Sequence, residues 1–454
     1  MSTINRREFL DRTKKTSLAM AAGVTILRSA ESARAYAAND KITLASIGVK
    51  GRGRQLAQGF LERGDCQVAY ICDPDSTLFA SRSKAFAEQQ GGKTPTCVQD
   101  MRKALDDASV DAVVVATPDH WHALAAIWAV QAGKDVYVEK PPSANCWEGR
   151  QMVKAARKYD RIMQVGTQNR SAPYNIAARK YIEEGKLGDI HMCRVYNQKL
   201  IRYPDAVPDS DPPEGFDWDL FNGPAPEARY NANYRHWHAW WRYSSGDMAN
   251  DGVHQLDIAR WLCGVEYPQS VYCTGGRFRA EGCDESPDSQ VAVFEFPKLV
   301  MTFELTLYTP YMLKSDGVLR ESDILPYWPQ NATRIEIYGT EGLMCVGRHG
   351  GGWQVFDRPR NRQPVVKDSM YGRFPDPEHK ENFLQCVRSR ALPNADIEKG
   401  HRSALLVHYA TASYRAGGVK VEIDPDSEQM LGDEKARALF KREYRRPWVV
   451  PDEV

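Results

Sequence analysis

The sequence has little of several features that mark other classes of protein. Its ten cysteines are scattered and include no CxxC pair, so we expect neither a metal site of the zinc type nor a small-domain disulfide framework. Lysine and arginine (60) nearly balance aspartate and glutamate (59), and no basic run stands out, which gives no reason to expect nucleic acid as a partner. After residue 37, no apolar run approaches the length that spans a bilayer.

What is present is a chain of 454 residues, long enough for two ordinary domains after a leader segment. Residues 5–10 (NRREFL) resemble a twin-arginine export signal. A weakly apolar run at 17–27 and small residues at 33–37 complete the pattern of a cleaved signal, for which an amphipathic N-terminal helix is the alternative. We therefore expect residues 1–37 to direct export of the folded protein to the periplasm.

The first strand, at residues 41–47, runs into a glycine-rich turn and then a helix, which is the context of a dinucleotide-binding fingerprint. Gly48 fits the tight turn, and Gly53 fits the close packing of helix on strand. The middle glycine is replaced by Lys50. Gly51 can supply the room that the pyrophosphate needs, and the Lys50 ammonium can bind a phosphate.

A second strand at 67–72 ends at Asp73. A carboxylate at this place can accept both ribose hydroxyls of the adenosine and would repel a 2′-phosphate, so it favours NAD over NADP as the cofactor. The alternative is an aspartate that opens a turn before Pro74.

Residues 111–142 read as a βαβ crossover, with buried strands at 113–116 and 136–138 around a helix at 121–131. Helices at 76–90, 100–108 and 146–159 and a strand at 162–165 complete a Rossmann domain over 41–166. Groups beyond the carboxyl ends of such strands face the ligand crevice. We therefore expect the following residues to converge there: Thr117, Pro118, His122, Glu139, Lys140 and Pro141.

Lys140 stands out within this group because two prolines follow it. Proline restricts its own φ and the residue before it, so the lysine lies on a stiff, extended segment and has a fixed direction. A surface lysine at a strand end is the alternative.

A second domain, at 167–430, begins with a helix at 173–184, a strand at 189–199 and a long aromatic-rich connection at 201–245. Long connections of this kind line sites or interfaces. Aromatic rings with scattered donors suit a sugar or polyol. The substrate-binding candidates are Tyr234, His236, Trp241 and Arg242, with interface or core packing as the alternative.

His254 lies in a helix that we expect from about residue 251 to 262. On helical geometry, Asn250 and Asp251 precede it by one turn and Asp257 follows it by one turn. An imidazole flanked by polar groups is a plausible proton acceptor near neutral pH, although a lone histidine in a helix is often a core residue.

The remaining strands, at 271–278, 290–296, 300–308, 334–338 and 343–346, indicate a large, mostly antiparallel sheet in an α+β second domain. Helices are expected at 377–388 and 400–414. Residues 431–454 read as a C-terminal tail, exposed from 445 onward.

Taken in order, these motifs resemble the Gfo/Idh/MocA oxidoreductases, and residues 217–224 and 250–261 resemble a subgroup common among exported bacterial members. The resemblance implies a Rossmann domain, a second domain whose open sheet often forms homo-oligomers, and hydride transfer between a sugar or polyol and nicotinamide. It assigns Lys140 to polarise the reacting oxygen and His254 to act as acid/base. The family's usual aspartate, four residues before the histidine, falls on Asn250 here, and Asp251 is one place off.

Two alternatives stay open. An NAD-dependent glycosidase that works by transient oxidation belongs to a related group, but its motif lacks the lysine found here at position 140. A non-catalytic sugar-binding or assembly protein with a degraded cofactor loop is supported by Lys50 and Asn250 alone. Because free NAD is scarce outside the cytoplasm, a cofactor that stays bound through each turnover is a related expectation.

Overall fold

The structure is a computed structural model that describes residues 41–454, apart from 202–203, 280–281, 283 and 315–316. The predicted export signal at 1–37 lies outside the described residues. None of the described helices is both long and apolar enough to cross a membrane.

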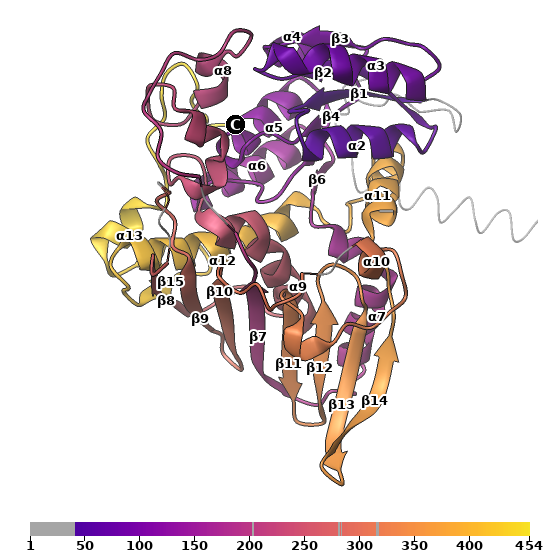
Figure 1. Cartoon of the computed structure of the whole chain (residues 1–454), viewed down its shortest axis with the longest axis vertical. Coiled ribbons are helices and arrows are strands. Elements are labelled where there is room, and N and C mark those ends of the chain that lie inside the picture. Colours follow the sequence, from indigo (N-terminus) through magenta and orange to yellow (C-terminus); the bar gives the residue numbers. More distant parts are fainter. Residues whose placement is uncertain (1–40, 202–203, 280–281, 283, 315–316) are drawn as a thin grey trace, which may run out of the picture. The chain divides into compact units, whose positions relative to one another are not determined.

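The first domain is a six-stranded parallel sheet in the order β3-β2-β1-β4-β5-β6 (Figure 1, indigo to magenta). The order reverses between β1 and β4, which is where open α/β sheets form their ligand crevice. The predicted Rossmann fold is confirmed. Its elements are β1 (Ile42–Ile47), α2 (Arg52–Leu61), β2 (Cys66–Cys72), η1 (Ser76–Leu78), α3 (Phe79–Gln89), β3 (Thr96–Val98), α4 (Arg102–Leu105), β4 (Ala112–Val115), α5 (Asp119–Gln131), β5 (Asp135–Val138), α6 (Cys146–Lys158) and β6 (Met163–Val165).

The second domain is built on a ten-stranded sheet in the order β14-β13-β12-β11-β7-β10-β9-β8-β15-β16. The β7–β10 pair is parallel, and the other pairs described are antiparallel, as predicted. Its strands are β7 (Ile190–Gln198), β8 (Ser270–Gly276), β9 (Ser289–Glu295), β10 (Val300–Thr306), β11 (Arg334–Gly339), β12 (Gly342–Gly347), β13 (Trp353–Arg360), β14 (Gln363–Met370), β15 (Val421–Ile423) and β16 (Met430–Leu431).

Among the helices of the second domain, α9 and α12 contribute apolar residues that join those of the sheet in one core. Tyr272, Val291 and Val300 on the strands are about 40% exposed, so part of the sheet surface faces solvent within one chain. Homo-oligomer formation through this surface stays a prediction. The helices are η2 (Gln168–Ser171), α7 (Pro173–Glu183), α8 (Trp218–Asn222), η3 (Ala232–Arg235), η4 (Trp237–Ala239), η5 (Met248–Gly252), α9 (Val253–Cys263), α10 (Gly317–Arg320), η6 (Trp328–Gln330), α11 (Asp376–Ser389), α12 (Ile397–Arg415) and α13 (Glu434–Ala438).

The β13–β14 hairpin is absent from our sequence-based predictions. Strands are recognised by alternation of buried apolar and exposed polar residues. β14 is exposed or half-buried along its whole length and charged at several positions, so it carries little of this pattern. Its pairing with β13 forms the edge of the sheet.

The prediction that residues 445–454 are exposed is wrong for Trp448, Val450 and Val454, which are buried. The Trp448 side chain is 4% exposed and packs against Trp121 and Trp128 of α5, with ring centroids 5.4 and 6.1 Å apart. Arg445 pairs with Asp219 of α8 at 2.5 Å. Aromatic burial of this size outweighs the polar composition of the tail, which therefore belongs to the core of the first domain.

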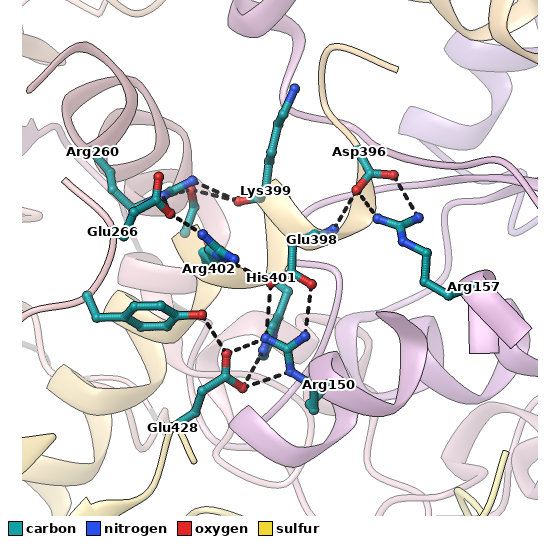
Figure 2. A network of polar contacts seen from close by, with 12 residues as sticks. Arg150, Arg157, Arg260, Glu266, Asp396, Glu398, Lys399, His401, Arg402 and Glu428 are labelled. Atoms are coloured by element: carbon teal, nitrogen blue, oxygen red, sulfur yellow. Dashed lines mark hydrogen bonds and ion pairs between the residues drawn. The ribbon is translucent and has the colours of Figure 1, made fainter. Parts of the chain in front are cut away.

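An ion-pair network joins the two domains (Figure 2). Arg150 of α6 pairs with Glu398 of α12 at 2.8 Å and donates to Glu428, with 3.0 Å between its Nε and the carboxylate. His401 lies 2.9 Å from the same Glu428. The first-domain helix α6 is thereby fixed to the second-domain helix α12.

Candidate active site

One cavity of about 670 Å³ lies at the carboxyl ends of the parallel strands and is lined by both domains. The structure brings most of the predicted site residues to it. The predicted residues that line this cavity are Gly48, Lys50, Gly51, Asp73, Thr117, Pro118, His122, Glu139, Lys140, His236, Asn250, Asp251 and His254.

In the glycine turn, two glycines are closely packed against neighbouring atoms, and a third has free space around it. Gly48 has a φ of +80°, and a Cβ on it would lie 2.6 Å from the Ala116 carbonyl oxygen. A Cβ on Gly53 would lie 1.7 Å from the carbonyl oxygen of Gly48. A Cβ on Gly51 would meet no described atom within 4 Å. The turn therefore needs glycine at its two ends for packing and leaves free space at Gly51, beside the cavity.

The same turn presents the N-terminus of α2. Gly51 is the N-cap, and no side chain among the described residues caps this helix. The first N–H groups of a helix lack partners within the helix and bind phosphates well. Lys50 adds a nearby ammonium, whose pKa is lowered by burial and by the positive charge of Arg235.

Asp73 has a structural task in addition to the predicted one. Its carboxylate accepts the Val49 N–H at 2.8 Å and the Asp75 N–H at 3.0 Å, and burial raises its pKa. Each carboxylate oxygen keeps a further lone pair. The next carboxylate, Asp75, pairs with Arg235 at 2.5 Å. Asp73 therefore holds the glycine turn while it faces the cavity.

Part of the long connection lies over this end of the cavity. Asp75 forms a β-bridge with Phe216, and the Trp121 indole donates to the Leu220 carbonyl at 2.9 Å. Phe216, Leu220 and Arg235 line the cavity. The connection therefore lines the end of the cavity where we expect the nucleotide to bind.

Lys140 is held from both domains. Its ammonium donates to the main-chain carbonyl of Asn250. Its backbone N–H lies 3.3 Å from the carboxylate of Glu139, which pairs with Arg52 at 2.9 Å. The aimed lysine that the two prolines predict is thus tied to the segment that carries His254.

His122 braces the loops on either side of Lys140. Its Nδ1 lies 2.6 Å from the Pro141 carbonyl oxygen and its Nε2 lies 2.8 Å from that of Thr117. Burial lowers its pKa. The ring therefore joins the loop after β4 to the loop after β5, which makes His122 a positioning residue.

His254 is 4% exposed, and its Nδ1 has no hydrogen-bond partner among the described residues. Burial, together with the positive charges of Arg348 and Lys140, lowers its pKa well below the usual 6.5. The imidazole is therefore neutral near neutral pH, which is the form that accepts a proton.

The segment before His254 differs from the predicted α-helix. Residues Met248–Gly252 form a π-helix, η5, and α9 begins at Val253. The Asn250 amide donates to Asp247 at 3.0 Å. Asp251 pairs with Lys199 at 2.8 Å and not with the imidazole of His254. Burial would raise the pKa of Asp251, but Lys199 and neighbouring cations hold it well below 3.8. The wider turn of a π-helix changes which side chains share a face, and sequence patterns rarely reveal it.

Sequence and structure comparisons agree on the family. A model described as an oxidoreductase family with an NAD-binding Rossmann fold matches residues 9–167. Models of the GFO/IDH/MocA C-terminal domain and of the oxidoreductase family's C-terminal alpha/beta domain match 220–345 and 347–450. The chain belongs to the Gfo/Idh/MocA oxidoreductase family.

Two curated relatives show how similar the sequence of this chain is to other members of the family. The chain is 30% identical to inositol 2-dehydrogenase 2 of Saccharopolyspora erythraea over 44% of its own length, and it spans about half of that relative (47%). It is 26% identical to the scyllo-inositol 2-dehydrogenase (NAD(+)) of Bacillus subtilis over 72% of this chain and 81% of the relative.

Among solved structures, the aldose-aldose oxidoreductase of Caulobacter crescentus, complexed with glycerol, superimposes with a TM-score of 0.62 at 18% identity. The alignment covers 84% of this chain and all of the other. A likeness at this identity shows the shared fold.

The first domain matches the NAD-binding Rossmann domain of this family, and the turn described above fits that cofactor. The open space at Gly51, the uncapped N-terminus of α2 and Lys50 would hold the pyrophosphate, and Asp73 would accept from the ribose. Thr117 Oγ1 is a buried hydroxyl that lines the cavity and has no partner among the described residues. Neither the glycosidase nor the non-catalytic alternative gains support from these comparisons.

The three other candidates from the aromatic connection lie elsewhere in the described chain. Arg242 lies over the Tyr234 ring at 5.0 Å, and Tyr234 packs edge-on against Trp240 at 4.9 Å. Trp241 lies under Arg415 at 5.2 Å. These side chains pack against neighbouring residues, as the packing alternative states, whereas His236 lines the cavity.

Sequence reasoning missed several residues that line the cavity. Asp119, at the start of α5, accepts from Ser244 at 2.5 Å, and burial raises its pKa to about 7 although Lys140 opposes this. Its place between Pro118 and His122 is a signal that could have identified it. Lys199, Lys314 and Arg348 come from separate strands and loops, and no local pattern links them.

Proposed function

We propose that the protein is an NAD-dependent dehydrogenase of a sugar or polyol. The observation that carries the proposal is that the Lys140 ammonium and the neutral imidazole of His254 line one cavity with the glycine turn. The names of the two curated relatives, both inositol dehydrogenases, support this substrate class.

The two side chains divide the work of oxidation. Lys140, held by the Asn250 carbonyl, donates a hydrogen bond to the substrate oxygen and stabilises the negative charge that develops there. His254 accepts the hydroxyl proton, and in the reverse reaction it returns that proton. NAD held by the turn at Gly51 and by Asp73 would supply the hydride acceptor for the same carbon.

The test is a screen of sugars, inositols and their keto forms with the purified protein, which follows the appearance or loss of NADH absorbance. Oxidation of at least one alcohol with equal amounts of NADH formed supports the proposal. Absence of turnover across the panel, by a protein whose melting temperature rises with NAD, would count against it.

We also propose that residues 1–37 direct export to the periplasm by the twin-arginine route, on the strength of the NRREFL motif. Replacing Arg6 and Arg7 by lysine should leave the protein in the cytoplasmic fraction. A retained cofactor would suit that location, and mass spectrometry of the purified native protein should then detect bound nicotinamide. Unchanged export of the lysine variant would contradict the route.

A further inference from the structure

We propose that the substrate carries an anionic group, a carboxylate or a phosphate, which binds at Lys314 and Arg348. This inference rests on the proposed function and narrows its substrate class. It starts from the charges in the part of the cavity that the second domain lines.

Three cations converge on one carboxylate there. Asp251 Oδ2 lies 2.8 Å from Lys199 Nζ and 3.0 Å from Lys314 Nζ, and its Oδ1 lies 3.5 Å from an Arg348 nitrogen. Lys199 also pairs with Asp247 at 2.9 Å, so this aspartate and Asp251 balance two of the three cations.

Other carboxylates near the cluster already have partners. Glu139 pairs with Arg52, and Asp119 accepts from Ser244 and has a pKa raised to about 7 by burial. Lys140 lines the same cavity and adds a further positive charge. The second-domain end of the cavity therefore holds more positive than negative charge.

Hydrogen-bond donors also remain available. Arg348 is 7% exposed, yet its Nε has no partner among the described residues. The Lys314 side chain is 40% exposed and lines the cavity, and an ammonium has three donors. Buried donors without partners are costly, and a planar guanidinium suits a carboxylate or phosphate.

The ionisation of these groups agrees with the geometry. Burial lowers the pKa of Arg348 to about 10, and it lowers the pKa of Lys314 as well. The positive charges of Arg320 and Arg52 lower the pKa of Arg348 further. Those of Lys199 and Arg348 lower the pKa of Lys314 further. The carboxylate of Asp251 opposes both shifts. Burial lowers the pKa of His349, and the positive charges of Arg348 and Lys314 lower it further. A bound anion would relieve this repulsion and strengthen His254 as a base.

The balanced network in Figure 2 is a useful contrast within the same molecule. There, guanidinium groups and carboxylates alternate in equal number, and each guanidinium pairs with at least one carboxylate. The partners are Arg150, Arg157, Arg260 and Arg402 with Glu266, Asp396, Glu398 and Glu428. Around Asp251, three cations share two carboxylates, so the guanidinium and ammonium groups there outnumber their carboxylate partners.

The test compares acids with their neutral counterparts on the NAD-loaded, full-length protein. The pairs are D-glucuronate with D-glucose, D-galacturonate with D-galactose, and glucose 6-phosphate with glucose. We expect kcat/KM to be higher for the acid in at least one pair. Lys314→Gln should lower kcat/KM for that acid by about 10- to 100-fold, the value of a hydrogen bond to a charged group, and lower kcat/KM for the neutral sugar by a smaller factor.

Lys298→Gln is the matched control, because Lys298 is an exposed lysine of the same domain in the turn between β9 and β10. It should leave the acid preference intact. Arg348→Lys, which keeps the charge and loses the planar fork, gives a second variant, expected to raise KM for the acid more than it lowers kcat.

The outcomes separate this inference from the proposed function. Equal or better turnover of the neutral sugars would overturn the inference and leave the dehydrogenase proposal standing. If no sugar is oxidised, the proposed function fails, and thermal stabilisation decides the inference. A rise in melting temperature with glucuronate or glucose 6-phosphate that Lys314→Gln abolishes would support it, and no rise with either would overturn it.

Discussion

Lys140 lies in the first domain and His254 lies in the second. The main-chain carbonyl of Asn250, four residues before His254, links the two segments. The ammonium of Lys140 binds this carbonyl, and His254 follows it in the next helix. The lysine also lowers the pKa of His254, after burial and Arg348. Lys140 therefore helps to keep His254 in its neutral form.

Replacing Lys140 by alanine should lower kcat about 100- to 1,000-fold, the usual cost of losing one donor to the oxygen that gains charge. Binding of NAD should persist, since the glycine turn is untouched. Turnover kinetics with any substrate from the screen, together with calorimetric titration of NAD, measure both. Lys154→Ala, which removes an exposed lysine of α6 in the same domain, is the control. Full turnover by Lys140→Ala would remove this lysine from the mechanism.

The pH dependence should reflect the neutral imidazole. A base works in its unprotonated form, and the pKa of His254 lies well below 6.5. We therefore expect kcat/KM for oxidation to stay level as the pH falls through 6.5 and to decline at more acid pH. Any step near pH 7 should vanish in Asp119→Asn, because the Asp119 pKa is about 7. A decline centred on 6.5 in both proteins would contradict this account of His254.

At the scale of elements, the turn between β1 and α2 and the π-helix η5 shape the two ends of the cavity. In the turn, neighbouring atoms leave no room for a Cβ at Gly48 or Gly53, whereas a Cβ at Gly51 would meet no described atom within 4 Å. The π-helix points the Asn250 carbonyl at Lys140 and Asp251 at the cations. Both are backbone features, so the positions of the functional groups follow from chain geometry.

Two glycine variants should separate folding from cofactor binding. Gly51→Ala adds a methyl group where no described atom lies within 4 Å, so stability should change little while the Kd for NAD rises about tenfold. Gly53→Ala should instead destabilise the fold, by about 1–3 kcal/mol, because its Cβ meets the Gly48 carbonyl. Thermal melts with and without NAD measure both. Equal loss of stability in the two variants would contradict the distinction.

At the scale of the whole molecule, the two domains are joined by polar contacts and by the C-terminal tail. The network of Figure 2 fixes α6 to α12, and Glu428 is one of its buried carboxylates. The tail packs Trp448 against α5 after the chain has passed through the second domain. The cavity between domains therefore keeps its geometry through contacts that lie away from it.

Glu428→Gln should lower stability at neutral pH by about 1–3 kcal/mol, because it leaves the buried His401 without a carboxylate partner and leaves Arg150 with Glu398 alone. Burial would raise the Glu428 pKa, but hydrogen bonds from His401 and Arg150 hold it well below 4.5. Its contribution is therefore present above pH 4.5 and is lost as the pH falls toward the lowered pKa. Denaturant titrations across this range should show the two proteins converging in acid. A constant difference would rule out the charged pairing as its cause.

The sequence by itself determined the Rossmann strands other than β3, the glycine turn, the fixed direction expected of Lys140 and the helix of His254. Each of these depends on residues close together in the chain, where periodicity, glycine and proline act directly on the backbone. The antiparallel character of the second sheet was predictable for the same reason, whereas the charged hairpin β13–β14 lacks the necessary alternation.

The tertiary structure alone decided which distant side chains meet. Lys199, Lys314 and Arg348 reach Asp251 because sheet order brings their strands and loops together, and nothing local records that order. It likewise directed Tyr234, Trp241 and Arg242 to aromatic packing and buried Trp448. Burial and charge depend on the sum of neighbours in space, so the chemistry of the cavity, unlike its scaffold, is a property of the folded chain.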